Sequence, residues 1–345
     1  MTARSAILLS PLSSLYRAVT QARLTAYKRG LFEVTKLPVP VISIGNLTTG
    51  GTGKTPLVEW VSRELARRRR KICILTRGYG RENPGARVIV SDGSKVLTSA
   101  AEAGDEPFLL AQELIGLAAV VSDANRVAAG KWAIENLGAD VFVLDDGFQH
   151  LAMARDLDIV TIDATNPWGG GRLLPAGRLR EPRSGLARAH CLVLTRANQS
   201  NQISNLTTAL QRIMSGRPIL ISEMKLKGIF RMNSDHPEAF SDLPQQMAAF
   251  CAVGNPESFF NLLREAGIEP VFTRTFLDHH KYTQSDLTSL IKEAENAGAQ
   301  GLITTAKDAV KLQQSDLRLT CYVMKIEISI AEEDEFKKLL DTVTS

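Results

Sequence analysis

A glycine-rich loop between a predicted strand and a predicted helix most constrains the fold of this chain. The loop follows the apolar run 39–44 and reads GNLTTGGTGKTP over residues 45–56. In a phosphate-binding loop of this kind, backbone N–H groups face a polyphosphate, a lysine meets the outer phosphates and the next hydroxyl binds Mg²⁺. Lys54 and Thr55 occupy those two positions. Thr48 stands where the strict pattern has its first glycine, but the order of strand, loop and helix still predicts a nucleotide site.

Short apolar runs alternate with helical patterns from residue 38 to about residue 225. The runs are residues 39–44, 72–76, 118–122, 141–144, 159–162, 191–194 and 218–222. Several contain only apolar residues, as expected for parallel strands that are buried on both faces of a sheet. We therefore predict an α/β fold like that of P-loop NTPases, with a doubly wound, mostly parallel sheet over residues 37–225.

The rest of the chain predicts a second unit. At 345 residues the chain exceeds a usual single core, so two domains are expected. The mixed polar stretch 226–246 is predicted as a linker. Residues 247–345 are predicted as a smaller α/β domain, with strands near 248–253, 271–276, 302–305 and 322–328, helices over 257–266 and 285–297, and a final helix.

Residues 1–36 predict an amphipathic, basic segment. They contain six lysines and arginines against a single acidic residue, Glu33, whereas the whole chain has a net charge of +4. Apolar side chains such as Leu8, Leu12 and Leu15 are interspersed, but no apolar run reaches the roughly 18 residues of a membrane span, and no signal-peptide cleavage site follows. The segment can lie on an anionic membrane surface or pack on the protein's own core, and the sequence leaves both open.

Composition narrows the partners and the compartment. Only 6% of the residues are aromatic, which leaves little for a base-stacking surface, so nucleic acid is not favoured as a partner. The four cysteines lie far apart and show no spacing typical of zinc sites, which predicts reduced thiols in a cytosolic compartment.

An acidic pair follows the apolar run 141–144. Asp145 and Asp146 therefore lie at the carboxyl end of a predicted strand, the position at which P-loop enzymes hold their metal. Mg²⁺ takes few protein oxygens, so Thr55 and one of these aspartates, with water and phosphate oxygens, would complete its shell.

A second acidic pair, Asp105 and Glu106, precedes a proline-started helix. The pair can supply charges for the start of that helix, or it can act as a general base or metal ligand, because phosphoryl transfer to a hydroxyl needs a carboxylate near the acceptor proton. His279, beside Asp278, can tune such a base. Taken by itself, the triplet with His280 fits a partly exposed structural histidine pair better.

Arginines in glycine- or proline-flanked loops form a third set of candidates. They lie in RGYGR at 77–81, in DANR at 123–126 and in LLPAGRLRE at 173–181. The guanidinium fork suits phosphate recognition, and the alternative for each arginine is a surface ion pair.

Seven motifs occur in a fixed order between residues 45 and 311: GNLTTGGTGKTP, RGYGR, AGDEP, LDDGFQH, LLPAGRLRE, DHHKYT and TTAKDAVK. Together they resemble the tetraacyldisaccharide 4′-kinase family, the lipid A 4′-kinases of Gram-negative bacteria. The resemblance covers nearly the whole chain and accounts for Thr48, because the family's loop is similar to GNxTxGGxGKTP.

This resemblance implies a reaction and a location. The enzyme would transfer the γ-phosphate of ATP to the 4′-hydroxyl of a tetraacyl glucosamine disaccharide 1-phosphate and so form lipid IVA. It would act as a peripheral or monotopic protein at the cytoplasmic face of the bacterial inner membrane.

The resemblance also implies a role for each matching residue. ATP would be bound by Thr48, Thr49, Gly50, Gly51, Thr52, Gly53, Lys54 and Thr55. Asp105 would be the general base, assisted by His279, and Lys54 and Asp146 would act on the reacting phosphates. Mg²⁺ would be held by Thr55, Asp145 and Glu106. The lipid headgroup phosphate and the reacting phosphates would be bound by Tyr79, Arg126, His150 and Arg180.

Two other classes of protein remain as alternatives. A P-loop ATPase or GTPase switch at the membrane would carry a guanine-reading NKxD motif if it used GTP, but the corresponding loop reads TRAN at 195–198. A non-enzymatic membrane adaptor would use the basic N-terminus alone, and the phosphate loop with two downstream acidic sites argues against it.

Overall fold

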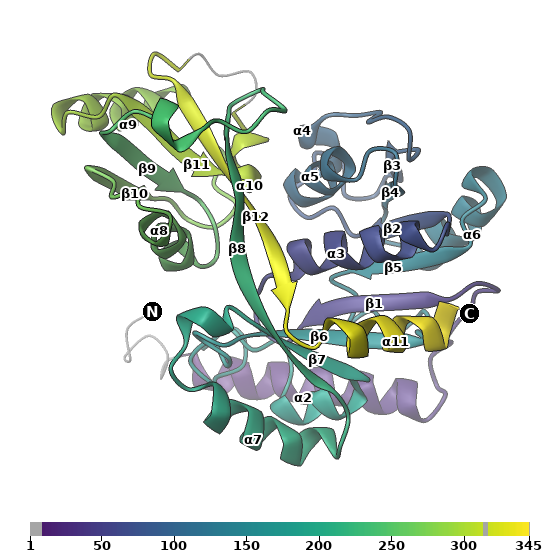
Figure 1. Ribbon diagram of the computed structural model, residues 1–345. Helices are drawn as coiled ribbons and strands as arrows, with labels where there is room; N and C mark the ends of the chain where they lie inside the picture. Colours follow the sequence, from purple (N-terminus) through teal and green to yellow (C-terminus); the bar gives the residue numbers. More distant parts are fainter. Residues whose placement is uncertain (1–8, 313–316, 345) are drawn as a thin grey trace.

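The computed structural model describes residues 9–312 and 317–344, which form two lobes joined by a long pair of strands (Figure 1). The strands follow the order β10-β9-β11-β12-β8-β7-β6-β1-β5-β2-β4-β3. Strand β8 belongs to both lobes, because it pairs with β7 in the larger lobe and with β12 in the smaller one.

The larger lobe is built on a mostly parallel sheet. Its central strand, β1 (Val41–Asn46), lies between β5 (Val141–Asp145) and β6 (Leu157–Asp163), and both pairings are parallel. The remaining strands of this lobe are β2 (Ile72–Thr76), β3 (Val88–Ser91), β4 (Ala118–Ser122), β7 (Cys191–Thr195) and the first part of β8 (Ile219–Arg231). Among the strand pairs described within this lobe, the pair of the edge strand β3 with β4 is antiparallel and the others are parallel.

Helices cover both faces of this sheet. Helix α3 (Lys54–Arg67) begins at the glycine-rich loop and buries Leu57, Val61 and Leu65 against one face, together with α5 (Asp105–Glu113). Successive side chains of a strand point to opposite faces of the sheet. The strand residues that do not face α3 and α5 therefore pack on the other face against α6 (Arg126–Leu137) and α7 (Ile203–Met214). The predicted α/β fold with a mostly parallel sheet is thus confirmed.

The smaller lobe repeats the arrangement on a smaller scale. Its strands β9 (Met247–Cys251), β10 (Phe272–Thr275) and β11 (Gly301–Thr305) are parallel, and β11 continues the sheet into β12 (Cys321–Ile330). Helix α8 (Pro256–Glu265) packs on one face and α9 (Gln284–Asn296) on the other. Two short helices, α4 (Ala100–Ala103) and α10 (Ala306–Ala309), stand close to the interface of the lobes.

Two expectations from the sequence need correction. Residues 226–231 are not a linker but the second half of β8, whose partner β12 runs antiparallel to it. One side of this ribbon is exposed, so its residues are partly polar and do not form an apolar run. The edge strand β3 was not expected, because it is short and only half buried. The other strand ends lie within two residues of the predicted ones.

The final helix, α11 (Glu333–Thr344), returns to the larger lobe rather than completing the smaller one. Phe336 is fully buried and stacks on Trp60 of α3 with ring centroids 4.9 Å apart. Arg68 donates to Asp341 across 2.7 Å. The cause is the antiparallel path of β12, which carries the chain back along β8 to the larger sheet (Figure 1).

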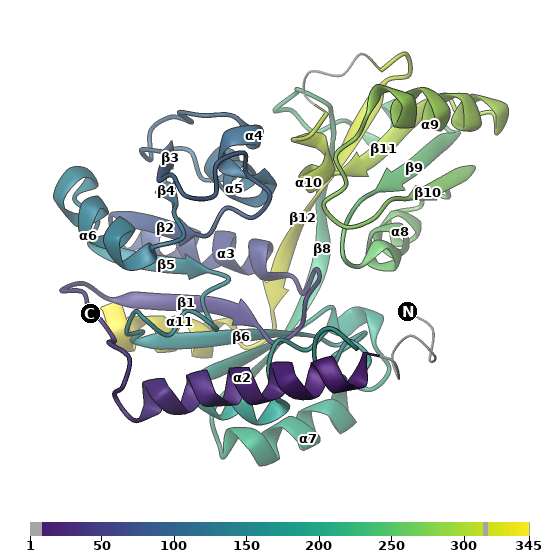
Figure 2. The same ribbon diagram turned by 180° about the vertical axis from the view of Figure 1, so that it is seen from behind.

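Helix α2 (Ser10–Lys28) lies along the outside of the larger lobe (Figure 2). None of its residues is fully buried, but Ser13, Tyr16 and Arg23 donate to carbonyl oxygens of the larger lobe, so α2 rests on the surface of that lobe. A helix packed on the protein and a helix on a membrane surface both remain compatible with this position. Leu8 and the other residues of 1–8 lie outside the described part of the chain. Among the described residues, we find no helix with the length and apolar character needed to cross a bilayer.

Candidate active site

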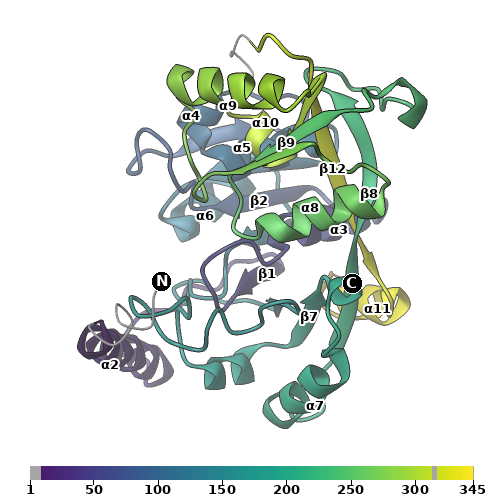
Figure 3. The ribbon, with the colours of Figure 1, turned by 90° about the vertical axis from the view of Figure 1, so that its left-hand side faces the viewer.

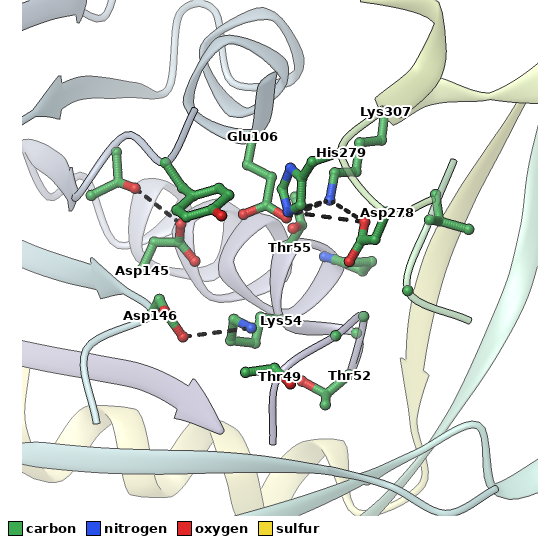
Figure 4. Close-up of a pocket in the computed structure, with 18 of the residues that line it drawn as sticks. Thr49, Thr52, Lys54, Thr55, Glu106, Asp145, Asp146, Asp278, His279 and Lys307 are labelled. Atoms are coloured by element: carbon green, nitrogen blue, oxygen red, sulfur yellow. Dashed lines mark hydrogen bonds and ion pairs between the residues drawn. The ribbon is translucent and has the colours of Figure 1, made fainter. Parts of the chain in front are cut away.

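A cleft of about 1040 Å³ separates the two lobes at the carboxyl ends of the large sheet's strands. Strands β1 and β5 are neighbours, so the glycine-rich loop after β1 and the acidic pair after β5 meet at this edge. The cleft is lined from the larger lobe by Lys54 and Asp146, from the smaller lobe by His279 and Lys307, and at one end by Tyr16 of α2. Figure 4 shows the labelled side chains of both lobes facing this space.

The glycine-rich loop is shaped by hydrogen bonds inside the protein. Asn46 donates from Nδ2 to the carbonyl oxygen of Thr48 at 2.7 Å and to the hydroxyl of Thr52 at 2.9 Å. The buried hydroxyl of Thr52 also pairs with the hydroxyl of Thr161 at 2.9 Å. The N–H of Thr49 donates to the carbonyl oxygen of Arg178 at 2.8 Å. The Thr52 hydroxyl is therefore engaged within the protein, and a phosphate would meet mainly backbone groups of the loop.

Lys54 and Thr55 open helix α3 directly after the loop. Gly53 precedes them with φ +78°, and a Cβ at this glycine would meet Met224 at 2.6 Å. A side chain cannot occupy that position without displacing its neighbours, which explains the glycine. The helix N-terminus, with its free N–H groups, is thus aimed at the cleft.

A buried arginine, which directly follows β7, supports the same loop. Arg196, with φ +58°, donates to the carbonyl oxygen of Gly51 at 2.9 Å, to Asp163 at 2.7 Å and to the Ser258 hydroxyl at 2.8 Å. Asn255, the N-cap of α8, donates to the same Asp163 oxygen at 3.0 Å. The geometry of the phosphate loop therefore depends on contact with the smaller lobe.

Gly254 of the smaller lobe lies against the phosphate loop, and Gly254→Ala is expected to weaken ATP binding. A Cβ at Gly254 would lie 2.3 Å from the backbone nitrogen of Gly51 and 2.9 Å from the Cα of Gly50, neither of which can move independently of the loop. Overpacking of this kind costs about 1–3 kcal/mol, so we expect the Kd for ATP to rise about tenfold in calorimetric titrations. Gly85→Ala is the matched control, because its Cβ would meet nothing closer than 3.7 Å. Equal affinities in the two variants would refute the contact.

Asp146 is the most strongly paired carboxylate of the site. Its oxygens accept from Arg180 at 2.8 and 2.7 Å, and Lys54 lies 3.5 Å away. Burial raises the pKa of Asp146, but Lys54, Arg180 and Arg126 outweigh burial and keep that pKa well below its usual range. Asp146 therefore stays ionised and orients two cations toward the phosphate loop.

Asp145 and Glu106 are two further carboxylates of the site, and their negative charges lie close enough to affect each other. Asp145 accepts from the Thr76 hydroxyl at 3.2 Å, and burial together with the charges of Glu106 and Asp146 raises its pKa to about 6. In the described part of the chain, no three His, Cys, Asp or Glu side chains are grouped to hold a metal on their own. Glu106 is paired with Lys307 at 3.0 Å, whereas no cation forms an ion pair with Asp145 among the described residues. The two carboxylates and Thr55 fit Mg²⁺, which takes few protein ligands and completes its shell with water and phosphate.

Asp105 meets His279 across the cleft, although 173 residues lie between them in the sequence. Oδ2 of Asp105 lies 3.8 Å from Nδ1 of His279. Asp105 is the first residue of α5, and His279 stands in the loop after β10 with φ +61°, a conformation that costs a residue other than glycine about 1 kcal/mol. Backbone strain of this kind clusters at functional sites, so the loop aims its histidine at the cleft at a cost in stability.

Comparison with known proteins agrees with this geometry. A sequence profile of the family described as tetraacyldisaccharide-1-P 4′-kinase matches residues 5–345. The tetraacyldisaccharide 4′-kinase of Geobacter metallireducens is 41% identical over 338 residues, with 97% of each chain covered. That of Desulfotalea psychrophila is 39% identical over 94% of this chain and 92% of its own length. The crystal structure of LpxK from Aquifex aeolicus in complex with ATP has a TM-score of 0.78 and 32% identity, and the match covers 99% of each chain.

The chain belongs to the tetraacyldisaccharide-1-P 4′-kinase family. The family predicted from the seven motifs is thus confirmed, and with it an ATP-dependent kinase of lipid A biosynthesis. This assignment is favoured over the switch-type ATPase or GTPase. The TRAN loop, where a guanine-reading motif would stand, instead contains Arg196, which is turned inward to the phosphate loop.

The remaining predicted residues of this family member also line the cleft, with different degrees of burial. Arg126 is buried at the start of α6 and donates to the backbone oxygen of Asp146 at 3.3 Å. His150 lies nearby, and burial and the charge of Arg126 lower its pKa to about 4, so the ring is neutral at pH 7. Nε of Arg126 and Nε2 of His150 are buried without a hydrogen-bond partner among the described residues, as expected for groups that bind a ligand. Tyr79 is 71% exposed, and its ring leans on His279 at 5.1 Å.

One arginine of the three loops that were candidates for phosphate recognition has a structural role. Arg81, from RGYGR, is buried and donates to the carbonyl oxygens of Ser122 at 2.7 Å and Pro84 at 2.5 Å. Its two terminal nitrogens thus fasten its own loop to the end of β4, and a buried arginine of this kind is not the surface ion pair that was the alternative.

Sequence reasoning missed three residues of this site: Arg196, Asn255 and Lys307. Lys307 does lie in TTAKDAVK, one of the seven motifs, but neither spacing nor charge pointed to a role. Its ammonium donates to Glu106 at 3.0 Å and to Asp278 at 3.4 Å, and it lies 3.3 Å from Nε2 of His279. Burial lowers the pKa of Lys307, but Glu106 and Asp278 outweigh burial and raise that pKa above its usual value.

Proposed function

We propose that this chain transfers the γ-phosphate of ATP to the 4′-hydroxyl of a tetraacyl glucosamine disaccharide 1-phosphate at the membrane surface, which forms lipid IVA. The observation that carries the proposal is that one cleft is lined by a nucleotide loop ending in Lys54 and by His279 of the opposite lobe, whose Nδ1 lies 3.8 Å from the carboxylate of Asp105. A hydrolase would need only to position water, whereas a transferase needs a base directed at a second substrate. In this proposal residues 37–225 bind ATP and residues 247–345 bring His279 to the site.

The reaction would use this chain's residues in three ways. Asp105 accepts the proton of the 4′-hydroxyl while the oxygen of that hydroxyl bonds to the γ-phosphorus. The bond from this phosphorus to the β–γ bridging oxygen breaks, which releases ADP. Lys54 and Arg180, both oriented by Asp146, stabilise the charge on the transferring group. The backbone N–H groups of the loop from Thr48 to Thr55 bind the other phosphates.

Thr55, Asp145 and Glu106 are the residues that would hold Mg²⁺. The chemistry that Mg²⁺ would supply there is positive charge, which stabilises the negative charge of the reacting phosphates. The positive charge would also favour the ionised form of Asp145, whose pKa is raised first by burial and then by the charges of Glu106 and Asp146.

Four side chains would bind phosphates of the two substrates. Arg126 and Arg180 are the cations, His150 is a neutral hydrogen-bonding group, and Tyr79 is the exposed ring at the mouth of the cleft. Arginine forks match phosphate oxygens in geometry, and this favours recognition of the reacting phosphates and of a headgroup phosphate.

Helix α2 supports the membrane part of the proposal. Leu12, Leu15 and Val19 are 53%, 63% and 60% exposed, and their spacing places them along one side of the helix. Tyr16 donates to the carbonyl oxygen of Arg180 at 2.9 Å, and Tyr16 and Val19 line the cleft. The helix stands at the outer edge of the molecule (Figure 3). An apolar stripe beside the cleft would let the acyl chains remain in the membrane while the sugar is phosphorylated.

Replacing Leu12, Leu15 and Val19 together by glutamine is expected to release the protein from lipid vesicles. Three exposed apolar side chains contribute about 1.5 kcal/mol each when they enter a membrane interface, so sedimentation with anionic vesicles should weaken by at least tenfold. The KM for the lipid should rise, and that for ATP should stay within about twofold, because the phosphate loop begins beyond this helix.

Leu97→Gln is the control, because this leucine is 45% exposed but lies outside the cleft and α2. The basic residues of 1–36 should add about 1 kcal/mol per contacting lysine or arginine on anionic vesicles, and salt should reduce this part. Equal binding of the triple variant and the natural chain would rule out α2 as the membrane contact.

The function itself is tested by incubating purified protein with ATP, Mg²⁺ and a tetraacyl disaccharide 1-phosphate in detergent. The expected product is the 1,4′-bisphosphate, formed in equal amount to ADP, and mass spectrometry of the lipid detects it. ADP formation that does not depend on the lipid would support the switch-type ATPase instead.

A further inference from the structure

We infer that Lys307 is a positioning residue for phosphoryl transfer, because its ammonium fixes His279 as the tautomer with the ring proton on Nδ1, the nitrogen that faces Asp105. The inference rests on the proposed roles of Asp105 and His279. It also gives a function to TTAKDAVK, the motif to which no role was assigned. Figure 4 shows Lys307 reaching from the smaller lobe to Glu106, with Asp278 and His279 around its nitrogen.

The donors and acceptors at Lys307 match in number. An ammonium group has three N–H donors and no acceptor. Among the residues that the structure describes, three acceptors lie around Nζ, namely Oε1 of Glu106 at 3.0 Å, Oδ1 of Asp278 at 3.4 Å and Nε2 of His279 at 3.3 Å. The side chain is only 17% exposed, so water cannot easily replace one of these partners.

This arrangement decides which histidine nitrogen carries the proton. A neutral imidazole has one N–H and one acceptor nitrogen. If Nε2 of His279 were protonated, its hydrogen would point at the ammonium of Lys307, which cannot accept it. Asp278 cannot accept it instead, because its Oδ1 is 3.9 Å from Nε2. Nε2 is therefore the acceptor, and the N–H lies on Nδ1, 3.8 Å from Oδ2 of Asp105.

The tautomer matters for the proposed base. An Nδ1–H directed at Asp105 can donate to one carboxylate oxygen and leave the other for the substrate hydroxyl. The opposite tautomer would place a lone pair against the carboxylate, and the two groups would repel each other. Histidine in proteins is commonly oriented in this way by the bond that its other nitrogen makes.

Lys307 and His279 are placed relative to each other through a single residue, Ala252. Asp308, the residue after Lys307, is fully buried and accepts from the N–H of Ala252 at 2.9 Å. The carbonyl oxygen of Ala252 accepts from the N–H of His279 at 3.4 Å. Thr305 caps α10 through the N–H of Asp308 at 3.1 Å, which fixes the start of the helix on which Lys307 stands.

The same lysine connects this pair to the other lobe. Glu106, its closest partner, follows Asp105 at the start of α5. One ammonium thus contacts the neighbour of the proposed base on one side and the histidine that orients this base on the other. Loss of Lys307 should misplace His279 without removing any group proposed to touch a substrate.

The inference is tested by NMR of protein labelled with ¹⁵N at histidine, without a turnover assay. In the natural chain, the ring of His279, assigned by its absence in His279→Gln, should show a protonated Nδ1 and an unprotonated Nε2. In Lys307→Met it should shift to the Nε2–H tautomer or to a mixture. Lys281→Met, at an exposed lysine two residues after His279, should leave the spectrum unchanged. A protonated Nε2 in the natural chain would overturn the inference whatever the variants do.

Kinetics supply the second readout. Lys307→Met should lower kcat about 10- to 100-fold, with the KM for ATP within about threefold, as expected for loss of a group that orients another. In a His279→Gln background the same substitution should cost little more, because Lys307 acts through His279. A full additional loss in that background would place its effect on Glu106 and would refute the inference. In that case the proposed kinase function would stand, since it is measured separately by product formation.

Discussion

Asp105→Asn is expected to lower kcat by about 10²- to 10⁴-fold while leaving the KM for ATP nearly unchanged. Asparagine keeps the shape of the side chain but cannot accept the proton of the sugar hydroxyl. Asp105 stands at the first position of α5 with its carboxylate toward His279, so the substitution removes one charge and disturbs no core packing. Initial rates with saturating lipid and varied ATP separate the two constants.

The double variant with His279→Gln identifies what the histidine does. If His279 acts only through Asp105, the double variant should be much less damaging than the product of the single effects. Losses that multiply would instead give the two residues separate roles. Asp235→Asn, at an exposed carboxylate outside the cleft, is the control and should keep full activity. This result would show that the loss in Asp105→Asn does not come merely from removing one negative charge from the protein.

Lys54→Ala is expected to reduce turnover on the order of 10²-fold or more, about 2.7 kcal/mol of transition-state stabilisation. The ammonium lies 3.5 Å from Asp146 at the start of α3, in the position from which it meets the outer phosphates of a nucleotide. A neutral side chain cannot replace this charge on the transferring phosphoryl group. Arg180 still pairs with Asp146 in the variant, so that carboxylate is not left unpaired.

Lys131→Ala, at an exposed lysine of α6, is the matched control for Lys54→Ala and should have no effect on turnover. Thermal unfolding should also be similar for the two variants, because neither lysine is part of the core. Near-normal turnover in Lys54→Ala would exclude the assignment of this loop to ATP.

The phosphate loop and the acidic pair could be predicted from the sequence because both depend on local signals. The apolar runs before Gly45 and before Asp145 define strands, and the residues that follow a parallel strand lie at its carboxyl end in any arrangement of the sheet. Their proximity required only that β1 and β5 be neighbours, and the structure shows this pairing.

Other features could not be deduced from local signals, because contacts between distant segments decide them. In the sequence, Asp105 and Glu106 can be explained equally well as charges at a helix start and as catalytic groups. The structure adds that His279 faces Asp105 and that Lys307 pairs with Glu106. The inward position of Arg196 could not be foreseen either, since its partners lie in the phosphate loop, at the end of β6 and in α8, which are far apart in the sequence. The roles of these residues in the reaction stay predictions.

The sequence by itself thus determined the fold class, the nucleotide loop and the family, because periodicity and ordered motifs are properties of the chain read in one direction. The tertiary structure alone decided which residues complete the site. The ribbon of β8 and β12 sets the smaller lobe against the larger one, and so brings Gly254 onto the phosphate loop and Lys307 to Glu106. The same ribbon returns α11 to the core beside Trp60. Such contacts depend on the path of the backbone through space, and no spacing of residues along the chain encodes that path in a form that can be read locally.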